Sequence, residues 1–495
     1  MPGIAFRERP AHSTAIRYEK EKAKMENAYE PTWNSLATHP APQWFREAKF
    51  GIYTHWGPYS VPAYGRNGTW YPHCMYREDT KEYKHHVKTY GPPSEFGYKD
   101  FIPMFTAEKF DPEEWAELLK NAGARFAGPV AEHHDGFTMW DSKLTKWNAA
   151  RMGPKRDVVG ELEKAIRAQG LRFATTFHHA NNWWFFPNWK KEFDCANPEY
   201  AGLYTRPHQE HERPDKEYLD RWRDKIIEVI DSYQPDLLWF DFALGRIQES
   251  YRKQFLAYYY NKEAEWGREV AVTYKEMPKG WHNLPPMCGV LDLEVGKMNE
   301  LTAHAWITDT TVDAGPDGTW SYVKNVGYKS VERLVHNLVD RVSKNGYLLL
   351  NVGPRADGTI PEQAQECLLG IGKWLEVNGE AIYGTTPWFA YGEGPTKQEG
   401  GKHFNETGEP RYTAHDIRFT VKGNMLYAIC LGRPGDAVTI KTLKSLYESE
   451  IKSVRMLGVD RDLKWQLDEE DGLTIETPPA MPSAHACAFS IELAE

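Results

Sequence analysis

The sequence predicts an α/β fold, an irregular (β/α)8 TIM-like barrel followed by a C-terminal antiparallel β-sandwich. Eight strand-like runs end in polar residues between His55 and Asn351, and helices separate several of them. From about Pro387 the helical periodicity gives way to alternating runs divided by turns. Parallel strands joined by helices form barrels, with the chemistry at the carboxyl ends of the strands. We expect an N-terminal arm at 1–40, the barrel at 41–390 and the sandwich at 391–495.

Several helices of the barrel are predicted from their ends. Asp111 is an N-cap, Pro112 stands at the first helical position, and Gly123 stops that helix. Similar signals predict further helices at 157–169, 331–342 and 361–377, and another that ends near 232. The intervals 276–289 and 294–306 are too short and too rich in proline and glycine for full helices, so the barrel is expected to be irregular there.

Composition narrows the classes of partner. The 495 residues include 60 Lys and Arg against 70 Asp and Glu, a net charge of −10. This disfavours nucleic acid and anionic membranes as main partners and favours a neutral or weakly charged ligand. Aromatic residues make up 14% of the chain, and such rings suit a wet concave site for a sugar-like ligand. The six cysteines are scattered, which argues against a zinc ribbon or disulfide scaffold.

The compartment and the assembly are less constrained. The N-terminus lacks the apolar stretch of a secretory signal, and no apolar run is long enough to span a membrane. A cytoplasmic protein is therefore favoured, or a periplasmic or secreted one if a signal peptide has been removed. A homo-oligomer is compatible with the sequence.

Two carboxylates follow predicted strands. Asp241 closes the apolar run 237–240, and Glu294 ends the run 290–293. In a retaining glycosidase one carboxylate attacks the anomeric carbon while the other protonates the leaving oxygen. The alternative roles are structural, because an acid after a strand also caps loops, and Glu294 could pair with a neighbouring base.

Histidines gather at the same strand ends. His55, His133, His134 and His178 offer donors and acceptors for sugar hydroxyls, and a metal-dependent barrel hydrolase would use the same residue type. Adjacent residues of a regular strand point to opposite faces, so His133 and His134 cannot both reach one ion. We expect no metal.

Five motifs in order then indicate a family. They are KFGIYTHWG from Lys49, HHDGF from His133, LWFD from Leu238, GYLLLNVGP from Gly346 and NGEAIY from Asn378. Over about residues 40 to 390 the chain resembles the α-L-fucosidases of glycoside hydrolase family 29.

The resemblance implies a retaining exo-glycosidase that hydrolyses terminal α-L-fucosyl residues of oligosaccharides or glycoconjugates. Hydrolysis would proceed by double displacement through a covalent fucosyl-enzyme intermediate, without cofactor or metal. The family nucleophile matches Asp241. The acid/base varies in position among members; Glu294, in the segment DLEVG, is our candidate, and Glu276 is the reserve. A position after Trp306 that carries the acid in some members is Ile307 here.

The predicted fucose pocket follows from the same resemblance. Its histidines match His55, His133 and His134, its indole matches Trp70, and the end of the next strand supplies Phe177 or His178. Trp239 and Trp306 complete the predicted substrate-binding set. The alternative functions are a fucose-binding protein that has lost catalysis and the metal-dependent hydrolase.

Overall fold

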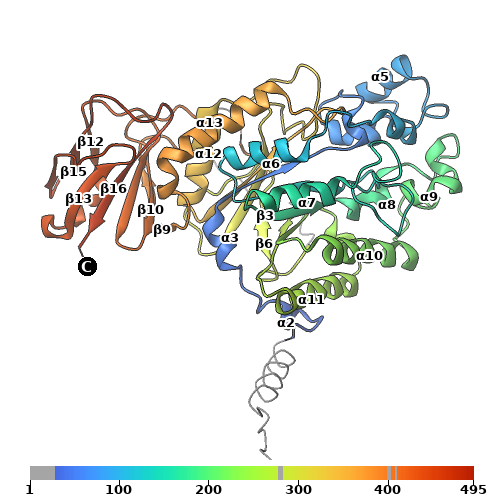
Figure 1. Ribbon diagram of the computed structural model, residues 1–495, viewed down its shortest axis with the longest axis horizontal. Helices are drawn as coiled ribbons and strands as arrows, with labels where there is room; N and C mark the ends of the chain where they lie inside the picture. Colours follow the sequence, from blue (N-terminus) through green and yellow to red (C-terminus); the bar gives the residue numbers. More distant parts are fainter. Residues whose placement is uncertain (1–27, 277–282, 398–402, 407–409, 495) are drawn as a thin grey trace, which may run out of the picture.

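Eight parallel strands form a closed barrel in chain order in the computed structural model, which describes residues 28–276, 283–397, 403–406 and 410–494. The strands are β1 (Phe50–Thr54), β2 (Phe126–Glu132), β3 (Arg172–Phe177), β4 (Leu237–Phe240), β5 (Ala271–Lys275), β6 (Val290–Asp292), β7 (Trp306–Thr311) and β8 (Gly346–Val352). β1 pairs with both β2 and β8, which closes the barrel (Figure 1). The predicted fold class is confirmed, and most of the predicted strand ends are within two residues of those observed.

Helices surround most of the barrel. The long ones are α6 (Pro112–Asn121), α7 (Val158–Ala168), α10 (Lys216–Tyr233), α11 (Glu249–Trp266), α12 (Val331–Ser343) and α13 (Glu362–Asn378). Shorter ones are α2 (Trp33–Leu36), α3 (Gln43–Ala48), α4 (Tyr71–Cys74), α5 (Lys81–Thr89), α8 (Asn182–Phe185) and α9 (Ala201–Tyr204). The Asp111 carboxylate caps α6 by accepting from the backbone N–H groups of Glu113 and Glu114, both at 3.0 Å.

The barrel is irregular where the sequence predicts it. Among the described residues, no helix lies between β5 and β6 or between β6 and β7. A cavity of about 730 Å³ with a mostly apolar lining opens there, and residues from 271 to 306 contribute most of its walls. No helix in the described parts of the chain is long and apolar enough to cross a membrane.

Large side chains fill the barrel interior. Tyr53, Phe126, Trp239, Ile307 and Leu349 belong to one buried cluster contributed by five different strands. This packed core forms a floor, so polar side chains at the carboxyl ends of the strands meet in a shallow cup above it.

The C-terminal module consists of two antiparallel sheets. One has the order β13-β16-β11-β10-β9 and the other β12-β15-β14. Their strands are β9 (Thr386–Glu393), β10 (Ile417–Lys422), β11 (Met425–Cys430), β12 (Ala437–Ile440), β13 (Ile451–Met456), β14 (Trp465–Asp468), β15 (Gly472–Glu476) and β16 (Cys487–Leu493). The expected boundary at 390/391 falls inside β9, so the module begins about five residues earlier.

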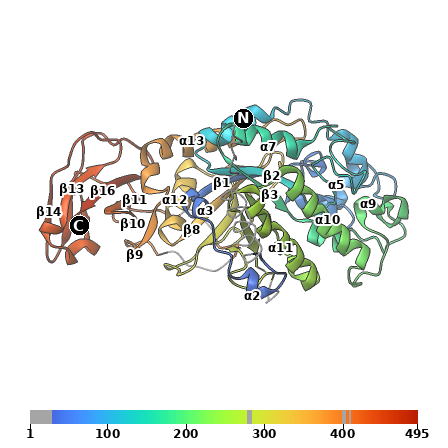
Figure 2. The ribbon, with the colours of Figure 1, turned by 60° about the horizontal axis from the view of Figure 1, so that its bottom comes forward.

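The module packs against α12 and α13, as Figures 1 and 2 show. Arg418 on β10 forms a buried ion pair with Asp340 on α12, with 2.8 Å between Nε and Oδ1. The Trp374 indole on α13 donates to the Ala486 carbonyl at 2.9 Å. These contacts tie the sandwich to the side of the barrel formed by α12 and α13.

Candidate active site

A polar cavity lies at the carboxyl ends of the barrel strands. Its lining combines four histidines, four charged side chains, three large rings and two small polar residues: His55, His133, His134, His178, Asp241, Lys275, Glu294, Asp309, Trp70, Phe242, Trp320, Asn67 and Thr69. Seven residues other than the catalytic candidates are predicted to bind the sugar, and five of them line this cavity.

Asp241 is held rigidly directly after β4. Its Oδ2 lies 3.0 Å from His178 Nδ1 and 3.3 Å from His134 Nε2, and its Oδ1 lies 3.0 Å from Lys275 Nζ. Burial raises the pKa of this carboxyl, but the Lys275 ammonium and His178 outweigh burial and hold the pKa well below its usual range. Asp241 is therefore an ionised carboxylate at neutral pH.

Lys275, at the end of β5, brings the two predicted catalytic carboxylates together. Its Nζ lies 3.2 Å from Glu294 Oε2 as well as 3.0 Å from Asp241 Oδ1. Those two oxygens are therefore at most about 6.2 Å apart. Carboxyl groups lie ~5–5.5 Å apart in retaining glycosidases and ~6.5–9.5 Å apart in inverting ones. The spacing fits retention of configuration.

Glu294 has the opposite electrostatic character. Burial raises its pKa to about 8, with Lys275 lowering it and the carboxylates of Asp309 and Asp241 raising it. At neutral pH the Glu294 carboxyl keeps its proton while Asp241 has lost its own. Two carboxyl groups whose environments push their pKa values apart provide an acid and a nucleophile in one cavity.

Two further carboxyl groups support Lys275 from below. Asp309 Oδ2 lies 3.2 Å from Lys275 Nζ, and Asp292 accepts a hydrogen bond of 2.7 Å from the Trp239 indole. Burial and the neighbouring Asp309 raise the pKa of Asp292 well above its usual range. Lys275 is thus the single ammonium contacting Asp241, Glu294 and Asp309 among the described residues.

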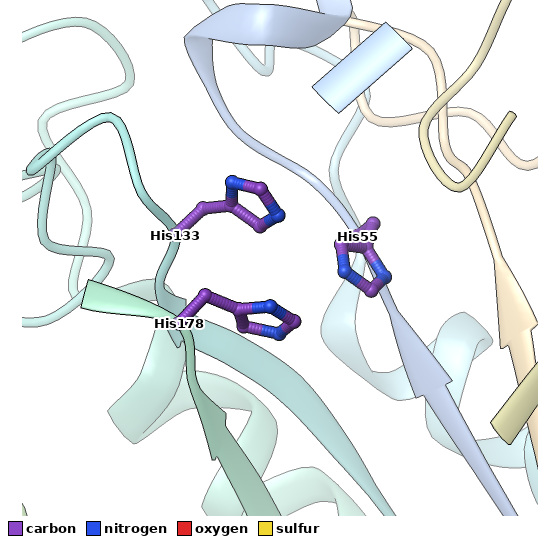
Figure 3. A group of neighbouring side chains, drawn as sticks. All are labelled: His55, His133 and His178. Atoms are coloured by element: carbon purple, nitrogen blue, oxygen red, sulfur yellow. The ribbon is translucent and has the colours of Figure 1, made fainter. Parts of the chain in front are cut away.

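Three histidines converge on the space beside Asp241. Figure 3 shows the rings of His55, His133 and His178, which follow β1, β2 and β3, turned toward a common centre. Burial lowers the pKa of all three, that of His178 to about 4. They are neutral at neutral pH, and a neutral imidazole carries one donor and one acceptor. His55 Nδ1 already contacts Asn351, and both nitrogens of His178 have partners, so His133 and His55 Nε2 are the groups placed to meet sugar hydroxyls.

The histidine spacing would also allow a metal ion, but the bonding of His178 opposes one. Two candidate groups exist in the described structure, His55 with His133 and His178, and His134 with His178 and Asp241. His178 belongs to both, and its Nδ1 and Nε2 already contact Asp241 and Thr176. His133 and His134 both line the cavity because they follow β2 rather than belonging to it, so the strand argument against their convergence does not apply.

Aromatic rings form the rim of the cavity. Trp70 and Phe242 stack with centroids 6.2 Å apart and an angle of 10° between the rings. Trp320 lies opposite, 5.5 Å from the His55 ring, and has a φ of 59°. A bulky residue in the left-handed region is strained, and such strain concentrates at functional sites.

Three predicted residues lie elsewhere. Trp306 opens β7 instead of closing it, so it sits toward the opposite end of the barrel, where its indole donates to the Lys344 carbonyl. Trp239 lies in the barrel core below the cavity, with its ring 4.9 Å from that of His178. Glu276 follows Lys275 and lines the apolar cavity near β6. These placements correct the expected pocket roles of Trp306 and Trp239 and leave Glu276 without access to Asp241.

Phe177 and His178, the two alternatives at the end of β3, lie in different environments. Phe177 packs in the outer core against Phe240, with ring centroids 5.8 Å apart, while His178 enters the cavity. Of the two predicted alternatives, His178, the residue directly after β3, therefore contributes to the cavity, and Phe177, the last residue of β3, does not.

Sequence reasoning missed several residues of the cavity. Lys275 closes β5 and Asp309 lies in the second half of β7, so charge at the carboxyl end of a predicted strand is the signal that could have found them. Trp320 lies in a loop that no periodicity marks. Asn67 is the N-cap of a single 3-10 turn, Gly68–Trp70, that contains Thr69, and this short turn is the local signal that could have drawn attention to both residues.

A segment of the C-terminal region contacts the loop that carries Glu294. The Glu294 backbone N–H donates to His403 Nδ1 at 3.2 Å, and the Phe404 N–H donates to the Glu294 carbonyl at 2.9 Å. Glu406 anchors this segment in the barrel, where Lys329 and Arg341 lie 2.8 and 3.0 Å from its carboxylate. These two cations outweigh burial and lower the pKa of Glu406 to about 2.

Comparisons with known proteins agree with the geometry. Residues 16–380 match the family model described as alpha-L-fucosidase, and residues 411–494 match the model of the alpha-L-fucosidase C-terminal domain. The human tissue alpha-L-fucosidase is 32% identical over 486 residues, covering 95% of this chain and 92% of the human protein. An alpha-L-fucosidase of Branchiostoma floridae is 33% identical, covering 93% and 94%.

A solved structure extends the likeness to three dimensions. The alpha-fucosidase of Thermotoga maritima, in complex with a mechanism-based inhibitor, superimposes with a TM-score of 0.74 at 33% identity. The match covers 94% of this chain and 100% of the Thermotoga chain. The predicted family and activity are confirmed: the chain belongs to the α-L-fucosidase family of retaining glycoside hydrolases.

Proposed function

We propose that Asp241 is the nucleophile and Glu294 the acid/base in the hydrolysis of terminal α-L-fucosyl residues from oligosaccharides or glycoconjugates. The observation that carries the assignment is the shared contact with Lys275. It keeps the two carboxyl groups within reach of one glycosidic bond while Asp241 is ionised and Glu294 protonated.

In the first step, an Asp241 carboxylate oxygen attacks the anomeric carbon of fucose. The bond from that carbon to the leaving oxygen breaks, and the Glu294 proton passes to this oxygen. In the second step, the Glu294 carboxylate takes a proton from water as the water oxygen attacks the same carbon. The bond to Asp241 then breaks, and both residues return to their starting states.

The surrounding residues bind the sugar. His55 and His133 present neutral imidazoles to the ring hydroxyls, His178 holds Asp241 in place, and the Trp70 and Trp320 rings offer apolar faces to the sugar. Because the cavity ends on the packed core of the barrel, a terminal residue enters and an internal one does not. This supports exo action.

Azide rescue tests the two roles separately. Asp241→Gly should lower turnover of an aryl α-L-fucoside on the order of 10⁴-fold or more, and azide should restore it by attack from the vacated side to give the β-fucosyl azide. Glu294→Ala should lose on the order of 10²–10⁴-fold on substrates with poor leaving groups, and azide should give the α-fucosyl azide.

Glu276→Ala is the matched control, because this acid lies outside the cavity and should retain wild-type turnover. Wild-type activity of Asp241→Gly, or identical azide products from both variants, would contradict the assignment. Fucose binding in calorimetry without turnover of any fucoside by the wild type would identify a binding protein instead.

A further inference from the structure

A second, larger hollow of about 1290 Å³ lies beside the catalytic cavity. We call it the basic groove. Residues 73–77 at the end of α4, 184–190 after the start of α8, 210–214 before α10 and 245–252 after β4 line it. Figure 1 shows α8, α9 and α10 on the side of the barrel away from the C-terminal sheets, and Figure 2 shows the same for α9 and α10.

Three chain segments connect the basic groove to the catalytic cavity. Trp70 lines the cavity, and its ring contacts that of His73, which lines the groove, at 5.4 Å between centroids. Phe242 lines the cavity, and Arg246 four residues later lines the groove. Phe185 packs on Trp70 at 5.4 Å, and its neighbour Trp184 faces the groove. The groove therefore starts at the rim formed by Trp70 and Phe242.

The charge of the basic groove opposes that of the whole chain. Its lining includes five cations, which are Arg77, Lys190, Arg213, Arg246 and Arg252, against two carboxylates, Glu210 and Glu249. Lys253 forms an ion pair with Glu249, and the Trp33 indole donates to that carboxylate at 3.0 Å, while Arg77 makes an exposed ion pair with Asp79 at 3.4 Å. The groove is thus a positive region on a protein of net charge −10, and such a region attracts anions.

Aromatic rings accompany these cations. Trp184 and Trp189 are both partly exposed in the groove, and the Arg246 guanidinium lies 4.7 Å from the Trp184 ring centroid. Indole faces pack against the apolar faces of sugar rings, whereas guanidinium groups bind carboxylate and sulfate oxygens with paired N–H donors. The combination suits an acidic carbohydrate better than a neutral one.

We propose that the basic groove binds the leaving-group part of the substrate, and that this part is an oligosaccharide carrying an anionic group, a carboxylate or a sulfate ester. The inference rests on the proposed function, because it places the fucosyl residue in the cavity beside Asp241. It adds a preferred class of substrate, acidic fucosylated glycans.

Matched substrates test the proposal. Four substrates are compared: an aryl α-L-fucoside, a neutral fucosylated oligosaccharide, and the same oligosaccharide bearing either a carboxylate or a sulfate on the leaving group. The variant Arg77→Gln/Arg213→Gln removes two exposed cations of the groove. Lys452→Gln/Lys464→Gln, at two exposed lysines of the C-terminal module, is the control for total charge.

The wild type should favour at least one acidic oligosaccharide over the neutral one in kcat/KM, on the order of 10-fold. The Arg77→Gln/Arg213→Gln variant should lose most of that preference, and added salt should reduce it, while the Lys452→Gln/Lys464→Gln control keeps it. The arm with the larger preference identifies carboxylate or sulfate as the group bound.

Equal kcat/KM on neutral and acidic oligosaccharides would overturn the proposal. Retention of the wild-type preference by Arg77→Gln/Arg213→Gln would overturn it as well. The aryl fucoside separates this failure from that of the proposed function. Turnover of the aryl fucoside without any acidic preference rejects only the basic groove as an anion site. No turnover of any fucoside rejects the catalytic assignment itself.

Discussion

Replacing Lys275 with methionine tests the electrostatic design of the active site. The change keeps the length of the side chain but removes the ammonium that lies 3.0 Å from Asp241 and 3.2 Å from both Glu294 and Asp309. Coulomb's law with an effective dielectric constant of about 20 gives about 5 kcal/mol for charges at 3.0 Å. Breaking a buried ion pair costs about 3–5 kcal/mol in proteins.

The lower of these values, about 3 kcal/mol, raises the pKa of Asp241 by about 2. Asp241 must be ionised to attack, so the acid limb of the profile of kcat/KM against pH should move toward neutral pH by at least that amount. Glu294 must be protonated, and Lys275 lowers its pKa, so the alkaline limb should rise above about 8. The optimum therefore shifts to higher pH, and activity on the acid side falls about 100-fold.

Lys344→Met is the matched control for stability. Lys344 is also buried and lies 2.9 Å from the Asp340 carboxylate, but it is remote from the cavity. Both variants should unfold at lower temperature, whereas only Lys275→Met should change the pH profile of an aryl fucoside assay. A wild-type profile in Lys275→Met, or the same displacement in both variants, would refute the reasoning.

Three other outcomes are expected. Glu294→Gln should abolish the alkaline limb near pH 8 in the hydrolysis of an aryl fucoside, because the group that loses its proton there is gone; a limb that persists would point to another acid. Trp320→Ala should raise KM for aryl fucosides by about 10-fold with a smaller change in kcat, measured against the exposed Phe389→Ala, because it removes an apolar wall. Glu406→Gln should lower the free energy of unfolding by about 3 kcal/mol at pH 7. The folded-state pKa of Glu406 is depressed to about 2, so this stabilisation is present above about pH 4.5 and is lost as the pH falls toward 2, where denaturant titrations of variant and wild type should converge.

The sequence predicted the barrel well because its strands and helices carry local signals. Asp241 was found because it closes a short apolar run, and capping residues such as Asp111 marked the helices. Helix α11 was not predicted. Its buried rings, including Phe255 and Tyr260, are spread around the helix, so the sequence shows no single apolar stripe there.

The electrostatics of the site could not be read in the same way. Lys275 contacts carboxyl groups at or near the ends of three other strands. These contacts depend on closure of the barrel, which no local pattern of residues reports. Trp306 was expected in the pocket because the family resemblance matches it to a Trp that precedes the acid in some members, but its position at the start of β7 puts it away from the cavity. Trp320 depends on a strained loop conformation that no local pattern of residues specifies.

The contact between the segment 403–406 and the Glu294 loop links the C-terminal module to the proposed acid/base. None of the module's described residues lines the cavity, yet the backbone of Glu294 is hydrogen-bonded to His403 and Phe404. A barrel cut off before β9 would keep Asp241 on β4 but lose the support that sets the position of Glu294. Such an isolated barrel should form the covalent intermediate from activated fucosides more readily than it hydrolyses natural ones, so a module outside the cavity would influence one of the two chemical steps through a single loop.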